Sequence, residues 1–103
     1  MAVFTEKEAE YPGGGAAMMK WIKDNLDYPQ TSIEMNEQGM VYVSWIVEKD
    51  GSISNIAIEK GVSPDIDKEA KRVIRTMPKW IHGEVNGEKV RARYMTAINF
   101  QLN

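Results

Sequence analysis

The sequence predicts an α+β fold, a two-layer sandwich in which two helices cover one face of a three-stranded antiparallel sheet in the order 2-1-3. Three observations predict it. Two segments, 16–25 and 64–77, carry apolar residues at helical spacing. An Asp-Gly turn at 50–51 joins two segments rich in β-branched and aromatic residues. The segment 89–102 alternates apolar and polar residues, which is typical of a half-buried strand.

Composition limits the classes of protein that the chain can represent. Its 103 residues fit a single domain. The absence of cysteine excludes disulfides, thiolate zinc sites and cysteine nucleophiles. A net charge of -2 gives little general attraction to polyanions, so no nucleic-acid partner is expected. No apolar run reaches the ~18 residues that a membrane span requires, and no signal peptide is visible.

The N-terminal third is expected to hold an arm and one helix. Residues 1–10 carry three glutamates and are expected to form a flexible arm, which leaves 11–103 as the folded domain. The glycine run 13–15 breaks the chain before the helix over 16–25. Pro29 ends that region, because the residue before a proline avoids helical dihedrals. The polar segment 31–38 is expected to be a short helical turn or a loop.

The hairpin pairs the strand over 40–47 with the strand over 52–60. A two-residue turn at Asp50-Gly51 would place the large apolar side chains on one face and leave Tyr42 and Ser44 on a solvent face. The pairs that this register predicts are Lys49 with Ser52, Trp45 with Ile56, Val43 with Ile58, Tyr42 with Glu59, and Ser44 with Ala57.

The second helix has clear start and stop signals. Ser63 is expected to cap it, Pro64 suits its first position, and Pro78 stops it. For the basic residues of its outer surface, a solvated face with acid-base pairs is favoured over a nucleic-acid contact. These residues are Lys68, Lys71, Arg72, Arg75 and Lys79.

The last strand is expected to have a free edge. After the irregular segment 80–84 and a tight turn at Asn86-Gly87, it runs for about 13 residues, longer than most strands. A right-handed crossover places it beside the first strand. Arg91 and Arg93 would blunt the start of its edge, whereas 94–100 carries no charge. That edge therefore either pairs with a partner by strand addition or is covered by the N-terminal arm.

No catalytic constellation is recognised, so the chain is not expected to be an enzyme. The single histidine, His82, lies in an irregular loop without a carboxylate or hydroxyl partner in sequence. No metal site and no cofactor are predicted. Trp21, Trp45 and Trp80 are expected in the core or at its edge, and a ligand cage for a small molecule or peptidoglycan is the weaker alternative.

Several stretches together resemble the C-terminal domain of TonB-type energy transducers, in the form found in Bacteroidetes. Their order and spacing are more specific than any single piece. At the loop Ile81-His82-Gly83 the chain departs from the family, which has proline and glycine there. The matching stretches are Glu10-Tyr11-Pro12-Gly13-Gly14, Tyr28-Pro29, residues 39–51 (GMVYVSWIVEKDG), residues 61–70 (GVSPDIDKEA), Met77-Pro78-Lys79-Trp80, Asn86-Gly87 and Ile98-Asn99-Phe100.

The resemblance implies a periplasmic domain of an inner-membrane-anchored protein that takes part in energised nutrient uptake. The implied partners are the TonB box of outer-membrane TonB-dependent transporters and the proton-driven motor complex of the inner membrane. The motor would act through an N-terminal part that is absent from this chain. The implied partner-binding residues are Tyr28, Pro29, Arg91, Arg93, Tyr94, Met95, Thr96, Ala97 and Asn99.

A second function stays open for the same fold. The domain could be the exported sensor or self-association module of a membrane regulatory protein linked to a peptidase. Related domains exchange strands to form homodimers, so both the monomer and the dimer stay open.

Overall fold

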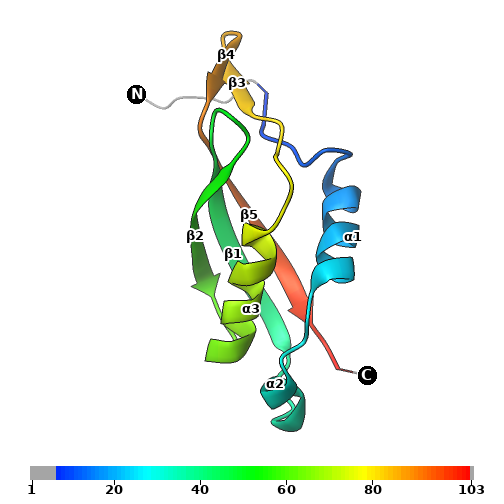
Figure 1. Ribbon diagram of the computed structural model, residues 1–103. Coiled ribbons are helices and arrows are strands. Elements are labelled where there is room, and N and C mark those ends of the chain that lie inside the picture. The colour runs from blue at the N-terminus through cyan, green and yellow to red at the C-terminus, as the bar shows by residue number, and fades with distance from the viewer. Residues whose placement is uncertain (1–6, 103) are drawn as a thin grey trace.

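Three strands form the central sheet: β1 (Gly39–Val47), β2 (Ile53–Lys60) and β5 (Ala92–Phe100). The computed structural model describes residues 7–102. The strand order is β2-β1-β5 and both pairings are antiparallel, which confirms the predicted order 2-1-3. Helices α1 (Gly15–Asn25) and α3 (Pro64–Arg75) lie against one face of this sheet, as Figure 1 shows. The predicted two-layer α+β sandwich is therefore confirmed.

The core lies between the two helices and the sheet. Alternate residues of β1 point into this core. The core side chains that the helices and the sheet contribute are less than 5 % exposed. This agrees with the helical and alternating patterns of the sequence, because each element turns one apolar face inward. The core side chains of α1, β1, α3 and β5 are Met18 and Ile22 of α1, Val41, Val43, Trp45 and Val47 of β1, Ile66, Ala70, Val73 and Ile74 of α3, and Ile98 and Phe100 of β5.

Local chemistry sets the ends of α3 as the sequence predicts. The hydroxyl of Ser63 accepts a hydrogen bond of 3.3 Å from the backbone N–H of Ile66. Pro64 follows at the first helical position, where its missing N–H costs nothing. The helix stops two residues before Met77, and Pro78 then prevents its continuation.

The expected single strand over 89–102 is wrong in its first part. The chain forms β4 (Glu88–Val90), leaves strand geometry at Arg91, and enters β5 at Ala92. Strand β4 pairs with β3 (Gly83–Val85) in a separate small sheet. The two-residue turn between them has positive φ at Asn86 (53°) and Gly87 (77°), as the Asn-Gly signal predicts.

The expectation that the segment 80–84 is irregular is also wrong. Ile81 exchanges backbone hydrogen bonds with Glu10, and Glu84 exchanges them with Lys7. Of the arm expected over 1–10, residues 1–6 lie outside the described part. Its last residues thus extend the small sheet and supply the backbone partners that 81–84 lacks locally.

The turn of the β1–β2 hairpin holds three residues, not two. The N–H of Glu48 donates to the carbonyl of Ser52 (2.8 Å), and the N–H of Gly51 donates to the carbonyl of Glu48 (2.9 Å). The predicted pair of Lys49 with Ser52 is therefore wrong. Gly51 has a φ of 86°, the left-handed conformation that this three-residue loop requires.

A bulge in β2 then restores the predicted register in the middle of the hairpin. Asn55, with a φ of 50°, is an additional residue on β2 at the register shift between Ser44 and Ile46. The predicted pairs Val43 with Ile58 and Ser44 with Ala57 are confirmed.

Trp45 falls within this shift and has no single partner, so its predicted pair with Ile56 is wrong. A further irregularity places Tyr42 opposite Lys60 rather than Glu59.

Candidate functional site

Strand β5 has one bonded side and one open side. It pairs with β1 along its whole length, from Ala92 opposite Val47 to Phe100 opposite Gly39. No strand among residues 7–102 pairs with its other side. The described end of the N-terminal arm, residues 7–10, bonds to residues 81–84 instead. Half of the backbone groups of β5 are therefore left available to an added strand.

The side chains of β5 alternate between the core and the uncovered face of the sheet. Tyr94 points inward, where its ring lies 4.7 Å from that of Trp80 and 5.3 Å from that of Trp45. Thr96 is half-buried opposite Val43. Of the sequence-predicted residues, Tyr94 and Thr96 thus offer a partner mainly their backbone.

The outward residues of β5 lie beside Ser44, Tyr42 and Met40 of β1. Met95 is 51 % exposed, and its neighbour in the register is Ser44. Ala97 lies opposite Tyr42, and Asn99 opposite Met40. This uncovered face consequently offers apolar side chains next to the free edge.

Arg91 lies between β4 and β5 and is held by Glu48. Its Nε and Nη2 atoms donate to the two carboxylate oxygens of Glu48 at 2.7 and 3.1 Å. The hydrogen bond from Arg91, followed by one from Ser54, lowers the pKa of the Glu48 carboxyl, and Glu48 in turn raises the pKa of Arg91. The arginine therefore reaches across the sheet rather than out from its edge.

Arg93 takes part in a similar contact on the uncovered face. Its Nη2 donates to Oε1 of Glu59 at 2.8 Å, and the hydroxyl of Ser44 donates to the same oxygen at 2.7 Å. The bond from Ser44, followed by that from Arg93, lowers the pKa of Glu59. Ser44 was expected on a solvent face, but it is only 4 % exposed, because these side chains bond above it.

The Tyr28-Pro29 segment lies beside the far end of β5. The Tyr28 ring meets Phe100 edge to face, with 5.6 Å between ring centroids. Its hydroxyl donates to the carbonyl of Glu37, and burial, together with the nearby Glu37 charge, raises its pKa. Pro29 precedes the short helix α2 (Gln30–Glu34). The fold thus brings a segment distant in sequence to the strand that was predicted to bind a partner.

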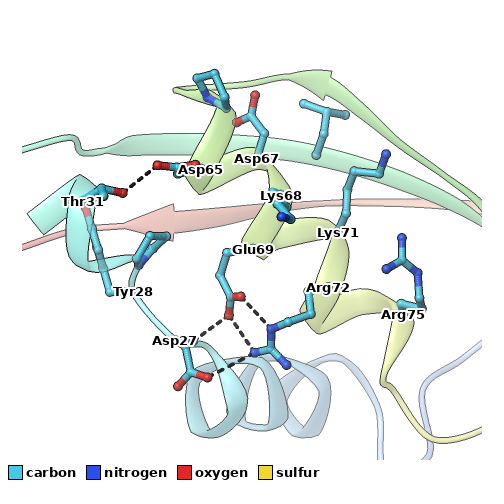
Figure 2. A pocket seen from close by; sticks show the side chains of 13 residues that line it. Asp27, Tyr28, Thr31, Asp65, Asp67, Lys68, Glu69, Lys71, Arg72 and Arg75 are labelled. Atoms are coloured by element: carbon cyan, nitrogen blue, oxygen red, sulfur yellow. Dashed lines mark hydrogen bonds and ion pairs between the residues drawn. The ribbon is translucent and has the colours of Figure 1, made fainter.

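A groove of about 900 Å³ between the 27–31 linker and α3 was missed by the sequence reasoning. Figure 2 shows Glu69 between Arg72 of its own helix and Asp27 of the linker. Glu69 accepts the backbone N–H of Asp27 (2.7 Å) and two bonds from the Arg72 guanidinium (2.6 and 2.7 Å). Burial acts to raise the pKa of Glu69, but these bonds prevail and lower it. The basic stripe on α3 was the only sequence signal for this groove.

Within residues 7–102, no helix is long and apolar enough to cross a membrane. The same residues contain no group of three or more histidine, aspartate and glutamate side chains placed to hold a metal ion.

Comparisons with known proteins agree in their outcome. The sequence model of the family described as Gram-negative bacterial TonB protein C-terminal matches residues 24–102. The proteins named TonB of two Xanthomonas campestris pv. campestris strains are 31% identical over 77 residues, which is 74% of this chain and 34% of each relative. The chain therefore spans about a third of the length of these curated relatives.

Two solution structures of the Helicobacter pylori TonB C-terminal domain have the same fold. One has a TM-score of 0.57 at 21% identity and covers 84% of this chain and 79% of that chain. The other has a TM-score of 0.58 at 20% identity and covers 85% of this chain and 95% of that chain.

Proposed function

The chain belongs to the family of C-terminal domains of Gram-negative bacterial TonB proteins, and on this premise we propose that it is the periplasmic partner-binding domain of a TonB-type energy transducer. Its partners are outer-membrane TonB-dependent transporters, whose TonB box adds as a strand to the open edge of β5. The inner-membrane anchor and the contact with the proton-driven motor complex belong to a part of the protein outside this chain.

The open edge of β5 is the observation that carries this proposal. The edge offers unpaired backbone donors and acceptors along Ala92–Phe100, and from Tyr94 onward it has no charged side chain to repel an extended peptide. In strand addition, affinity comes from main-chain hydrogen bonds and selectivity from neighbouring side chains.

The proposed contact has distinct parts. The added strand lies along Tyr94, Met95, Thr96, Ala97 and Asn99, and it bonds to the backbone groups of every second residue, those that face away from β1. Arg91 and Arg93 border its start, where each is already paired with a glutamate. The Tyr28-Pro29 segment borders its end through the contact with Phe100.

Amide chemical shifts test the proposal. Peptides from the N-termini of TonB-dependent transporters are titrated into the ¹⁵N-labelled domain, and we expect the largest shifts on the amides of residues 92–100. The absence of shifts there at millimolar peptide would exclude the proposed contact.

A pair of modified peptides provides the control. Every second N–H of an added strand faces its neighbour, while the others face away. N-methyl groups on one alternate set should abolish binding, and methyl groups on the other set should leave it nearly intact. Equal effects of both sets would show that the peptide does not add as a strand.

Self-association, as in an exported module of a membrane regulatory protein, is the second candidate. The observation that favours it is an exposed apolar group on the uncovered face: Met40 (40 % exposed), Tyr42 (37 %) and Met95 (51 %), carried by the paired strands β1 and β5. Sedimentation equilibrium would distinguish the candidates, because a Met95→Asp variant should weaken a dimer held by this face. The coding sequence upstream of residue 1 separates the transducer from a peptidase-linked sensor.

A further inference from the structure

The groove between the 27–31 linker and α3 has mixed walls. Acidic and basic side chains of α3 line it together with the apolar side chains of Tyr28, Pro29, Ile58 and Pro64. Figure 2 shows the side chains of Lys68, Lys71 and Arg75 along the helix at this groove. It does not include the open edge of β5, although its Tyr28-Pro29 wall also borders the end of the proposed strand-addition contact.

The acidic side chains of the groove are already bonded within the fold. Asp65 accepts a hydrogen bond of 2.6 Å from the Thr31 hydroxyl. Asp67 accepts the backbone N–H of Val62 at 2.9 Å. Both aspartates also lie in the first turn of α3, where the helix dipole stabilises negative charge.

The remaining pair of acids shares one cation. Arg72 binds Glu69 at 2.6 Å and lies 3.6 Å from Asp27. It also donates to the backbone carbonyl of Asn25 at 2.9 Å, which ties the end of α1 to α3. Together these bonds hold the linker wall of the groove in place. The positive charge of Arg72 is therefore already paired with Glu69 and Asp27.

Three cations of the groove have no such partner. Lys68, Lys71 and Arg75 are separated by three and four residues, so they follow one side of α3. Within the described part of the chain, no carboxylate lies within ion-pair distance of any of them. The groove therefore presents three available positive charges beside carboxylates that keep their charge but are held in place by hydrogen bonds within the fold.

We propose that this groove is a second docking site, which takes an extended peptide segment with spaced acidic side chains. Carboxylates of such a peptide pair with Lys68, Lys71 and Arg75, and its apolar side chains pack on the walls around Tyr28 and Pro29. A long polyanion fits poorly, because its continuous row of charges would also meet the four acidic side chains of the groove, whereas spaced carboxylates can lie beside the three cations alone. The site goes beyond the proposed strand addition and does not depend on it.

The test uses a ten-residue peptide of alternating glutamate and leucine, and the same peptide with glutamine in place of glutamate. Binding to the ¹⁵N-labelled domain is followed by amide shifts at 50 mM salt. We expect the glutamate peptide to shift residues 27–31 and 64–75 and to leave residues 92–97, which lie away from the Tyr28–Phe100 contact, unmoved. The glutamine peptide should bind about tenfold more weakly, since three exposed ion pairs are lost.

Two triple variants with the same net charge provide the control. Lys68→Ala/Lys71→Ala/Arg75→Ala should weaken binding of the glutamate peptide about tenfold. Lys23→Ala/Lys49→Ala/Lys89→Ala removes three exposed cations from other elements and should change it less than about twofold. Circular dichroism establishes that both variants are folded.

Several outcomes would overturn the proposal: no shift in the groove at millimolar peptide, equal binding of the glutamate and glutamine peptides, or equal losses in the two triple variants. Binding of a ten-nucleotide single-stranded DNA as tight as that of the peptide would assign the groove to polyanions instead. Transporter peptides are also titrated into the Lys68→Ala/Lys71→Ala/Arg75→Ala variant, where amide shifts on β5 measure strand addition alone. The failure of one site is therefore distinguishable from the failure of the other.

Discussion

Replacement of Gly51 by alanine tests how the β1–β2 turn is anchored to the aromatic core. The backbone N–H of Trp80 donates to the carbonyl of Gly51 at 2.9 Å. A Cβ atom at Gly51 would approach the Trp80 carbonyl oxygen to less than 3.0 Å, a distance that real Cβ contacts do not show. Gly87 is the matched control, because its φ of 77° resembles the 86° of Gly51 while a Cβ there has nothing within 4 Å.

The expected losses in the free energy of unfolding follow from three separate terms. A left-handed conformation costs alanine about 1–2 kcal/mol, and this term applies to both glycines. The reduced freedom of the unfolded chain returns about 0.4–1 kcal/mol in both variants. The backbone clash at Gly51 adds about 1–3 kcal/mol, as overpacking does elsewhere. Gly51→Ala should therefore lower the free energy of unfolding by about 2–4 kcal/mol and Gly87→Ala by about 1 kcal/mol.

Urea denaturation followed by tryptophan fluorescence measures both values. Amide spectra of the folded Gly51→Ala variant should also show shifts at Tyr94, whose ring packs on Trp80. Equal losses for the two variants would refute the reasoning, because the contact with Trp80 would then contribute nothing beyond backbone strain.

Three further outcomes are expected. Ser63→Ala should lower the free energy of unfolding by about 1 kcal/mol, while Ser63→Thr keeps most of the stability, because it keeps both the helix cap and the hydroxyl that donates to Glu37. The pKa of Glu69 is lowered in the fold, so its contribution to stability is present above the ordinary glutamate pKa of 4.5 and is lost as the pH falls through the folded value. Glu69→Gln should flatten this loss of stability in urea titrations at pH 3–6. In a carboxyl NMR titration, Ser44→Ala and Arg93→Ala should each raise the pKa of Glu59, because each removes a hydrogen bond that lowers it.

Local patterns predicted the elements and their order, but not the irregular backbone. The hairpin shows why. The Asp-Gly signal is compatible with both a two-residue and a three-residue loop. The structure has the three-residue loop, in which Gly51 accepts a hydrogen bond from the backbone of Trp80, a residue distant in sequence. The bulge at Asn55 then compensates for the difference. The central pairs were therefore correct although the turn type assumed for them was wrong.

The candidate site was predictable where it depends on one strand and not where it depends on several. The open edge of β5 follows from strand order, which the crossover fixes. The ion pair of Arg91 with Glu48 and the contact of the N-terminal arm with 81–84 join segments far apart in sequence. Charge and alternation along the chain do not encode such partners, so these contacts required the folded coordinates.

An aromatic cluster links the N-terminal segment to the proposed binding edge. Tyr11 meets Trp80 edge to face at 5.9 Å, and Trp80 packs at 4.7 Å on Tyr94, the third residue of β5. Immediately before Tyr11, Glu10 and Ile81 exchange backbone hydrogen bonds of 2.9 and 2.8 Å. A pull from the N-terminal side, as the proposed transducer requires, would be resisted by these bonds and by the burial of Tyr11 before it reached β5. Since both Tyr11 and Tyr94 contact Trp80, the proposed transducer function predicts that the segment before α1 bears part of the pull, although the family match begins at residue 24.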